Sequence, residues 1–220
     1  MKIRFGGIDI TLHHSGLAVL PASHTAIVSD LHLEKGSHFA RRGYYLPPYD
    51  SQATLEKLLG ALAQHQIRRV IFLGDSFHDK TAHERLAPAT RALLAQLAAL
   101  DCVWVRGNHD GDFAPEGFRP CLEHAQDGLL FRHEAAEAPE IFEVSGHYHP
   151  KAPISHKGGR LERPCFVEDG QRLVMPAFGA YAGGLTVTDP ALRQLFRAEY
   201  RVHVLGSARI YSFSGALLGN

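Results

Sequence analysis

Five short blocks that contain histidine or aspartate occur along this chain, and three of them follow a short run of strand-forming apolar residues. The runs are Ala26–Val28, Val70–Leu73 and Val103–Val105. The blocks are Asp30-Leu31-His32, Gly74-Asp75, Gly107-Asn108-His109-Asp110, His133 and Gly146-His147-Tyr148-His149. Loops that follow the carboxyl ends of buried strands meet at one edge of a sheet. We therefore expect these side chains to share one cleft.

The spacing of apolar residues predicts an α/β fold. In the first half, helical stripes that begin near Asp50 or Ser51 and near Pro88 alternate with the three strands, which indicates parallel strands covered by helices. Beyond residue 117 the pattern changes to short strands, expected at 118–122, 128–132, 140–145, 151–155, 161–168 and 171–175. We expect this half to form a second, mostly antiparallel sheet, packed face to face on the first within a single domain of residues 1–220.

Three further expectations concern the ends of elements. Asp50 or Ser51 is a favourable N-cap residue for the helix that follows. The polar sequence around His124 is typical of a turn, and residues 193–199 are expected to form a late helix before one last strand.

Composition excludes several classes of protein. The 220 residues carry 23 basic and 23 acidic side chains, so no global field attracts the chain to DNA or to an anionic membrane. The three cysteines lack C-x-x-C spacing, which argues against a disulfide scaffold. The N-terminus has no basic stretch followed by an apolar run, and no apolar segment approaches ~18 residues. We expect a cytoplasmic protein that does not enter a membrane.

The donor types of the blocks suit two divalent metal ions. One ion would take Asp30, His32, Asp75 and His149, and the other would take Asp75, Asn108, His133 and His147. Asp75 would bridge, because a carboxylate has two oxygens and can hold two cations about 3.5–4 Å apart. A water between such cations loses a proton readily, and the resulting bridging hydroxide would attack a phosphate ester.

Two histidines remain to be assigned. His109 follows the ligand candidate Asn108 and is expected to protonate the leaving group, with Asp110 holding its ring and favouring the imidazolium. Support of the metal ligands is the alternative role for His109. His133 follows an apolar run and is therefore favoured over His124 as the single histidine that supplies a metal ligand between the third and the last block.

The ordered set D-x-H, GD, GNHD, His and GHxH resembles the calcineurin-like metallophosphoesterase superfamily. The resemblance implies a four-layer α/β/β/α sandwich of two mixed sheets and a dinuclear centre that holds manganese, iron or zinc, with manganese the first expectation. It also implies that His109 is the protonating histidine. Mixed oxygen and nitrogen donors fit all three metals, and availability often decides between them.

A narrower resemblance covers most of the chain. The segments Ser29–Lys35, Phe72–His78, Arg163–Phe166 and Pro176–Gly184 look like those of bacterial ligase-associated metallophosphoesterases. That resemblance implies a DNA-repair endonuclease associated with an ATP-dependent DNA ligase and a helicase. Two departures are informative. The second motif lacks the Gly-Asp-x-x-Asp-Arg-Gly form of protein phosphatases, which argues against a phosphoprotein substrate, and Glu134 stands where many relatives have glycine.

The leading hypothesis is a metal-dependent phosphodiesterase that acts on a phosphate ester such as DNA. Basic residues after the ligand loops are candidates for contact with a phosphate backbone, and three tyrosines are candidates for base stacking. They are Lys35, Arg41, Arg42, Lys151, Lys157 and Arg160, with Tyr44, Tyr45 and Tyr148. The alternatives are a hydrolase of small or cyclic nucleotides, which a closed cleft would favour, and a scaffold without chemistry, which the retained His109 argues against.

Overall fold

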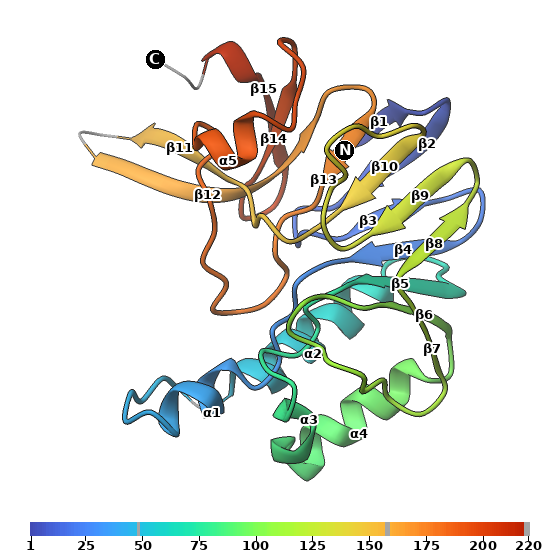
Figure 1. The fold of residues 1–220 in the computed structure, drawn as a ribbon, viewed down its shortest axis with the longest axis vertical. Helices are drawn as coiled ribbons and strands as arrows, with labels where there is room; N and C mark the ends of the chain where they lie inside the picture. The colour runs from blue at the N-terminus through green and yellow to red at the C-terminus, as the bar shows by residue number, and fades with distance from the viewer. Residues whose placement is uncertain (48, 157–158, 218–220) are drawn as a thin grey trace.

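The computed structural model describes residues 1–47, 49–156 and 159–217 and arranges them as two β-sheets with helices on the outer faces (Figure 1). In spatial order, the first sheet contains β1 (Lys2–Phe5), β2 (Ile8–Leu12), β3 (Ala18–Leu20), β4 (Thr25–Val28), β5 (Arg69–Leu73), β6 (Asp101–Val105) and β7 (Phe118–Cys121). The second contains β15 (Ile210–Ser214), β14 (Arg201–Leu205), β12 (Gly159–Glu168), β13 (Arg172–Val174), β10 (Phe142–Ser145), β9 (Leu129–Arg132) and β8 (Glu123–Gln126). A further strand, β11 (Lys151–His156), pairs with β12.

The helices divide between the two outer layers. They are α1 (Lys35–Ala40), α2 (Asp50–Leu62), α3 (Ala82–Arg85), α4 (Pro88–Leu97) and α5 (Pro190–Arg193), with a 3₁₀ turn at Gly215–Leu217. Helices α2 and α4 pack on the first sheet, whereas α5 packs on the second. The predicted α/β/β/α order of layers is confirmed.

Strand β5 shows how the side chains divide between these layers. Val70 and Phe72 point into the core shared with α2 and α4. Ile71 and Leu73 point into the core between the two sheets, where they meet residues such as Phe131 of β9. Successive side chains of a strand face opposite sides, so a continuous apolar run is what a strand between two layers requires.

The first sheet is antiparallel from β1 to β4 and parallel from β4 to β7. The segment 118–122 therefore does not open the second sheet as expected, because β7 pairs with β6 instead. In the second sheet β9, β10 and β13 are parallel neighbours, while the other pairs are antiparallel. Both sheets are thus mixed, and each contributes a parallel group whose carboxyl ends lie at one edge.

Three local predictions are wrong. Residues around His124 form the edge strand β8, which pairs with β9, rather than a turn. The late helix is α5, over Pro190–Arg193, and the chain then forms two strands rather than one. Helix α2 has no side-chain cap. Its Asp50 instead accepts a hydrogen bond from the Gly36 backbone, which ties α1 to α2.

None of the helices in the described part of the chain has the length and apolar character needed to cross a lipid bilayer.

Candidate metal centre

The predicted metal ligands lie where the parallel strands of both sheets end. Asp30 and Asp75 follow β4 and β5, and Asn108 follows β6. His133 follows β9, and His147 follows β10 in the second sheet. The two sheets pack face to face, so their carboxyl ends form one edge and the five loops converge there.

The first donor group consists of Asp30, His32 and His149, whose ligand atoms all lie within 4.8 Å of one another. His32 Nε2 lies 3.2 Å from His149 Nε2, and the latter lies 3.1 Å from Asp30 Oδ1. Asp30 is fully buried, and both histidines are largely buried. The group joins the loop after β4 to the loop before β11, so it forms only when both sheets are in place.

The second donor group consists of Asp75, His133 and His147, again with ligand atoms within 4.8 Å of one another. His133 Nε2 is its central atom. It lies 3.1 Å from His147 Nδ1, 3.0 Å from Asn108 Oδ1 and 3.4 Å from Asp75 Oδ2. The amide oxygen of Asn108 therefore lies beside the second group, and its role as a ligand stays a prediction.

These distances fit divalent metal ions. Two nitrogens bound to one ion at about 2.1 Å and at right angles are about 3 Å apart, close to the separation in both histidine pairs. The donors are imidazole nitrogens, carboxylate oxygens and one amide oxygen, a mixture that suits manganese, iron and zinc. The bridging position of Asp75 stays a prediction.

Hydrogen bonds to the backbone orient the donors. His133 Nδ1 lies 2.9 Å from the carbonyl oxygen of Leu73 and donates to it, which leaves Nε2 as the ligand atom. Asp30 Oδ2 accepts hydrogen bonds from the backbone N–H of His147 and from the Ser29 hydroxyl, so Oδ1 is left to face His149. His133 is thus presented to a metal ion through Nε2, and Asp30 through Oδ1.

The ligand loops adopt a backbone conformation that is uncommon for residues other than glycine. Five predicted ligands have left-handed φ angles: Asp30 (54°), His32 (46°), Asp75 (47°), His147 (70°) and His149 (47°). Such angles cost free energy and persist where the surrounding structure enforces them. They turn each loop sharply at the strand end, so that the side chains face one another.

Glycines allow the close approach that these loops need. A Cβ on Gly107 would clash with the carboxylate and backbone nitrogen of Asp75, and one on Gly146 would clash with the Ser29 hydroxyl and the Asp30 carboxylate. The segment Pro176–Gly184 supports the loop after β4 through backbone hydrogen bonds. The N–H groups of Phe178 and Gly179 bond to the carbonyls of Ser29 and Asp30 at 2.9 and 3.1 Å.

The electrostatics of the two donor groups differ. Burial lowers the pKa of His32 to about 4, so its ring is neutral and ready to bind a metal ion. Burial opposes the pKa shifts of both His133 and Asp75 in the second group. Mutual attraction between these two side chains outweighs burial, so it raises the pKa of His133 to about 9 and lowers that of Asp75 to about 2. A metal ion at this group would take the place of the His133 proton.

His109 lies beside the donors without joining either group. Its Nδ1 donates to the carbonyl oxygen of His78 at 2.8 Å, and its Nε2 lies 3.9 Å from Asp75 Oδ2. The side chain is 40% exposed. A ring held through Nδ1 presents Nε2 to the cleft, where it can give a proton to a bound group.

Asp110 does not hold the His109 ring as predicted. Its carboxylate instead accepts backbone hydrogen bonds from Phe77 and Gly107, both at 2.8 Å. Burial raises the pKa of Asp110 to about 6. Asp110 therefore positions the loop that carries Asn108 and His109, and the carbonyl of His78 orients the His109 ring. The sequence could not distinguish these partners, because Asp110 follows β6 and His78 follows β5, and neither pattern shows which of the two lies beside the His109 ring.

The sequence pattern assigned no role to His78, although this residue lies only three positions after Asp75. Its ring stacks on that of His109, with centroids 5.6 Å apart and planes 13° apart. Burial, together with nearby His32, lowers the pKa of His78 to about 3, so the ring is neutral. His124, the rejected alternative to His133, lies on β8 and bonds to Gln126.

Comparison with known families decides the identity of the fold and its chemistry. The family described as calcineurin-like phosphoesterase matches residues 23–197. The chain belongs to that family. It is accordingly a metal-dependent phosphoesterase, and the two donor groups are its candidate metal-binding sites.

Among solved structures, nuclease MPE of Pseudomonas putida is similar over 97% of this chain and 99% of that one, with 27% identity and a TM-score of 0.76. A phosphoesterase from Streptococcus pneumoniae TIGR4 is 14% identical over 86% of this chain and 96% of that one, with a TM-score of 0.36. The Vps29 mutant from Entamoeba histolytica is also 14% identical, over 86% and 97%, with a TM-score of 0.35. The comparison with curated proteins found no significant match.

Proposed function

We propose that this phosphoesterase hydrolyses phosphodiester bonds of DNA, in a repair role, with two divalent metal ions at one site. The observation that carries the proposal is the pair of donor groups side by side at one sheet edge. A pair of metal ions stabilises both the attacking and the leaving oxygen of an in-line displacement at phosphorus. Manganese is the proposed native metal.

In this proposal the chain's residues have distinct tasks. Asp30, His32 and His149 hold one ion, Asn108, His133 and His147 hold the other, and Asp75 holds both. When bound, the ions supply a nucleophilic water at neutral pH and neutralise charge on the phosphoryl oxygens. His109 holds the proton that the leaving oxygen needs, at Nε2.

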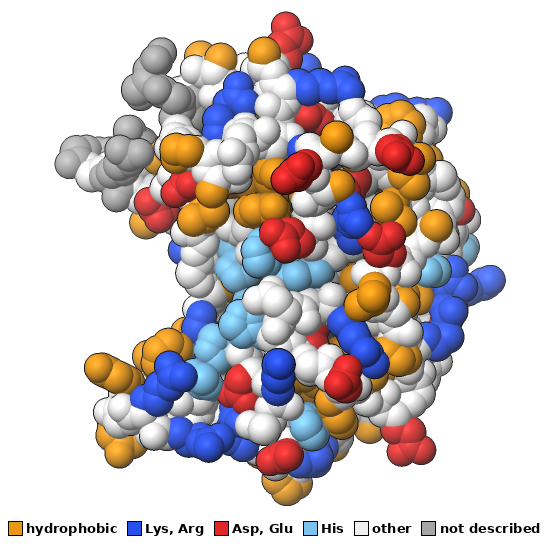
Figure 2. All heavy atoms as spheres, in the orientation of Figure 1, with side chains coloured by type: hydrophobic (Ala, Val, Ile, Leu, Met, Phe, Trp, Pro, Cys, Tyr) orange, Lys and Arg blue, Asp and Glu red, His pale blue; other side chains and the backbone are white. Residues whose placement is uncertain are grey.

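Two features support a polymeric substrate over a small one. The nuclease from P. putida shares 27% identity over almost the whole chain. Histidine side chains also gather at the base of an open hollow, with Lys and Arg side chains on its α1 side (Figure 2). Burial, together with the charge of Lys151 on β11, lowers the pKa of Lys35 on α1. Lys157 and the side chain of Arg160 lie outside the described residues.

The test is a turnover assay of manganese-loaded protein on bis-p-nitrophenyl phosphate, p-nitrophenyl phosphate and single-stranded DNA. Asp75→Asn is the critical variant, because a neutral amide cannot neutralise two cations, and we expect it to abolish hydrolysis. Asp9→Asn, at an exposed carboxylate paired with Arg4, is the matched control. Metal content is measured for each protein.

Cleavage of the diester and of DNA supports the proposal. Activity confined to small esters would assign the enzyme to nucleotide metabolism instead, and no activity in the loaded protein would favour a scaffold. Near-normal turnover by Asp75→Asn with full metal content would contradict the bridging role. Replacing manganese by iron or zinc tests the native metal.

A further inference from the structure

A cavity of about 320 Å³ lies beside the metal centre and is lined by His38, Arg41, Arg42 and Asp79. Three of these residues belong to α1 and the turn after it, and Asp79 follows β5. None of the four belongs to either donor group. The cavity therefore offers a second place for a polar ligand within the same cleft.

Asp79 is the only acidic residue that lines the cavity, and its charge is already matched. Arg85 pairs with it through Nη2 at 2.6 Å and Nη1 at 3.0 Å, Thr81 donates to it, and His38 Nδ1 lies 2.7 Å from Oδ2. Burial opposes the shift, yet Arg85 and His38 hold the pKa of Asp79 well below its ordinary value. The carboxylate thus serves to fix the His38 ring.

Arg41 and Arg42 supply the uncompensated charge. Both side chains are exposed, and neither forms an ion pair with a residue that the structure describes. With Asp79 matched by Arg85, the cavity carries two net positive charges next to the His38 ring. Guanidinium groups bind phosphate oxygens in a bidentate manner, so this lining suits a phosphate group.

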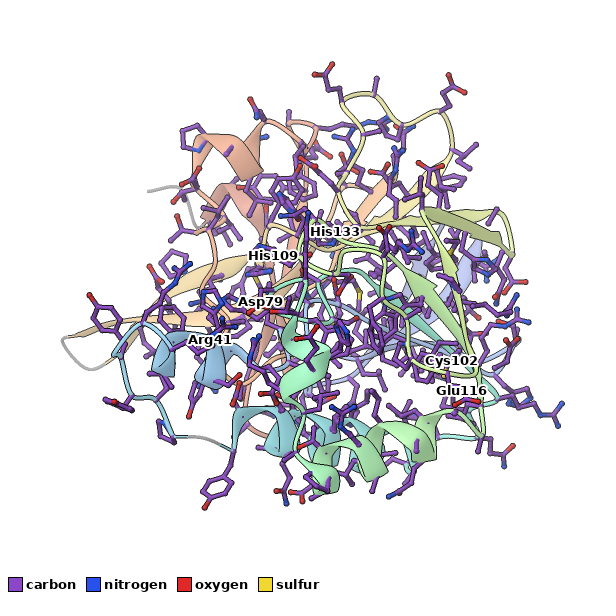
Figure 3. All side chains as sticks on the ribbon, turned by 60° about the horizontal axis from the view of Figure 1, so that its bottom comes forward. Arg41, Asp79, Cys102, His109, Glu116 and His133 are labelled. Atoms are coloured by element: carbon purple, nitrogen blue, oxygen red, sulfur yellow. The ribbon has the colours of Figure 1, made fainter. Side chains whose placement is uncertain are left out.

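A row of rings connects the cavity to the metal centre. The His38 and His78 centroids are 4.6 Å apart, and His78 lies 5.6 Å from His109 and 5.5 Å from His32. Arg41, Asp79 and His109 follow one another toward His133 in Figure 3. The cavity therefore lies on the side of the centre where His109 stands, separated from His109 by the ring of His78.

We propose that this cavity is a subsite for a non-scissile phosphate of a polynucleotide, on the leaving-group side of the bond that is cut. The inference rests on the proposed function, since a polynucleotide carries further phosphates on both sides of the bond that is cut. It assigns Arg41 and Arg42 to the phosphate oxygens, with the His38 ring held beside them by Asp79. The substrate strand would thus run from the metal centre over α1.

The double variant Arg41→Ala/Arg42→Ala tests this subsite against Arg68→Ala/Arg201→Ala, which removes two exposed arginines that do not line the cavity. Each protein is loaded with manganese and assayed on a single-stranded oligodeoxynucleotide and on bis-p-nitrophenyl phosphate, which has one phosphate. For the oligonucleotide we expect KM to rise at least about tenfold and the slope of log KM against log salt to fall by about 1 to 2. The effect on the small diester should be less than about threefold.

Phosphate interference locates the contact. Single uncharged methylphosphonate linkages are placed one, two or three nucleotides to either side of the cut. Wild-type protein should lose kcat/KM at one such position, on the fragment that departs without the scissile phosphate, and the double variant should show no such position.

The outcomes separate the two proposals. If wild-type protein hydrolyses bis-p-nitrophenyl phosphate but no oligonucleotide, the proposed function fails and the subsite fails with it. Equal KM and salt slope in the two double variants would overturn the subsite alone while DNA cleavage stands. Interference confined to the other fragment would overturn its placement on the leaving-group side.

Discussion

The base of the cleft and its α1 side hold their side chains in opposite ways. At the base lie the seven predicted metal ligands (Asp30, His32, Asp75, Asn108, His133, His147 and His149). Hydrogen bonds orient His133 and Asp30 among them, and five of the seven have left-handed backbone. On the α1 side, Arg41 and Arg42 are exposed, and Tyr44 and Tyr45 are 68% and 86% exposed. One region is rigidly preorganised, whereas the other can adapt.

The difference follows from what each region must do. Chemistry at phosphorus requires donors held close to one geometry before the substrate arrives, because reorganisation during the reaction would raise its barrier. Contact with a flexible strand tolerates variation in side-chain position. We therefore expect changes at the base to affect every substrate, and changes on the α1 side to affect only long ones.

After Asp75→Asn, the largest effect should come from His109→Ala. If Nε2 gives its proton to the leaving oxygen, the variant should keep its metal and lose kcat by about 10²- to 10⁴-fold on DNA. The loss should be much smaller on p-nitrophenyl esters, whose leaving group needs no proton. Steady-state kinetics check this, with His124→Ala on β8 as control. Equal losses on both substrates would contradict the proton-donor role.

A smaller loss of rate, common to all substrates, is expected from Gly107→Ala. The added methyl group would displace Asp75, and a misplacement of about 1 Å at a reacting centre can cost about 100-fold in rate. Gly183→Ala is the matched control, since a Cβ there meets nothing within 4 Å. Rates on DNA and on bis-p-nitrophenyl phosphate should fall together. A loss on DNA alone would place Gly107 with the adaptable side of the cleft.

On the α1 side, Tyr45→Ala should raise KM for single-stranded DNA about fivefold if the ring stacks on a base. Because no charge is removed, the salt dependence of KM should stay as in wild type, unlike that of the arginine variants. Tyr211→Ala, a partly exposed tyrosine on β15, is the control. A KM for DNA equal to that of the control would exclude stacking on Tyr45.

The smallest effect should be a gain. Glu134 Oε1 lies 3.9 Å from His147 Nε2, and the side chain is 65% exposed, so it places a negative charge at the rim of the metal centre. Glu134→Gln should lower KM for DNA about two- to threefold, the size expected of an exposed charge pair. Assays at low and high salt check the origin, because added salt should remove the gain. Weaker binding by this variant would show that Glu134 supports His147 instead.

Much of the site was accessible from sequence because its signals are local. Where a strand is followed by Gly-Asp or by Gly-Asn-His, the candidate ligand lies within a few residues of the strand. The apolar runs before Asp30, Asp75 and Asn108 identify buried parallel strands. The assignments of Asp110 and β7 failed for a different reason. Each depended on which of several neighbours a residue would meet after packing.

The sequence by itself determined that two sheets pack face to face and which chemical types of donor are present, because the pattern of apolar residues and the identity of side chains are properties of the chain alone. The α/β/β/α order of layers was implied by the family resemblance. Only the tertiary structure decided that His38, Arg41 and Arg42 line one cavity with Asp79, and that the carbonyl of His78 rather than Asp110 holds the His109 ring. These groupings join residues far apart along the chain. They depend on how two sheets pack through a shared core, and no local pattern encodes that.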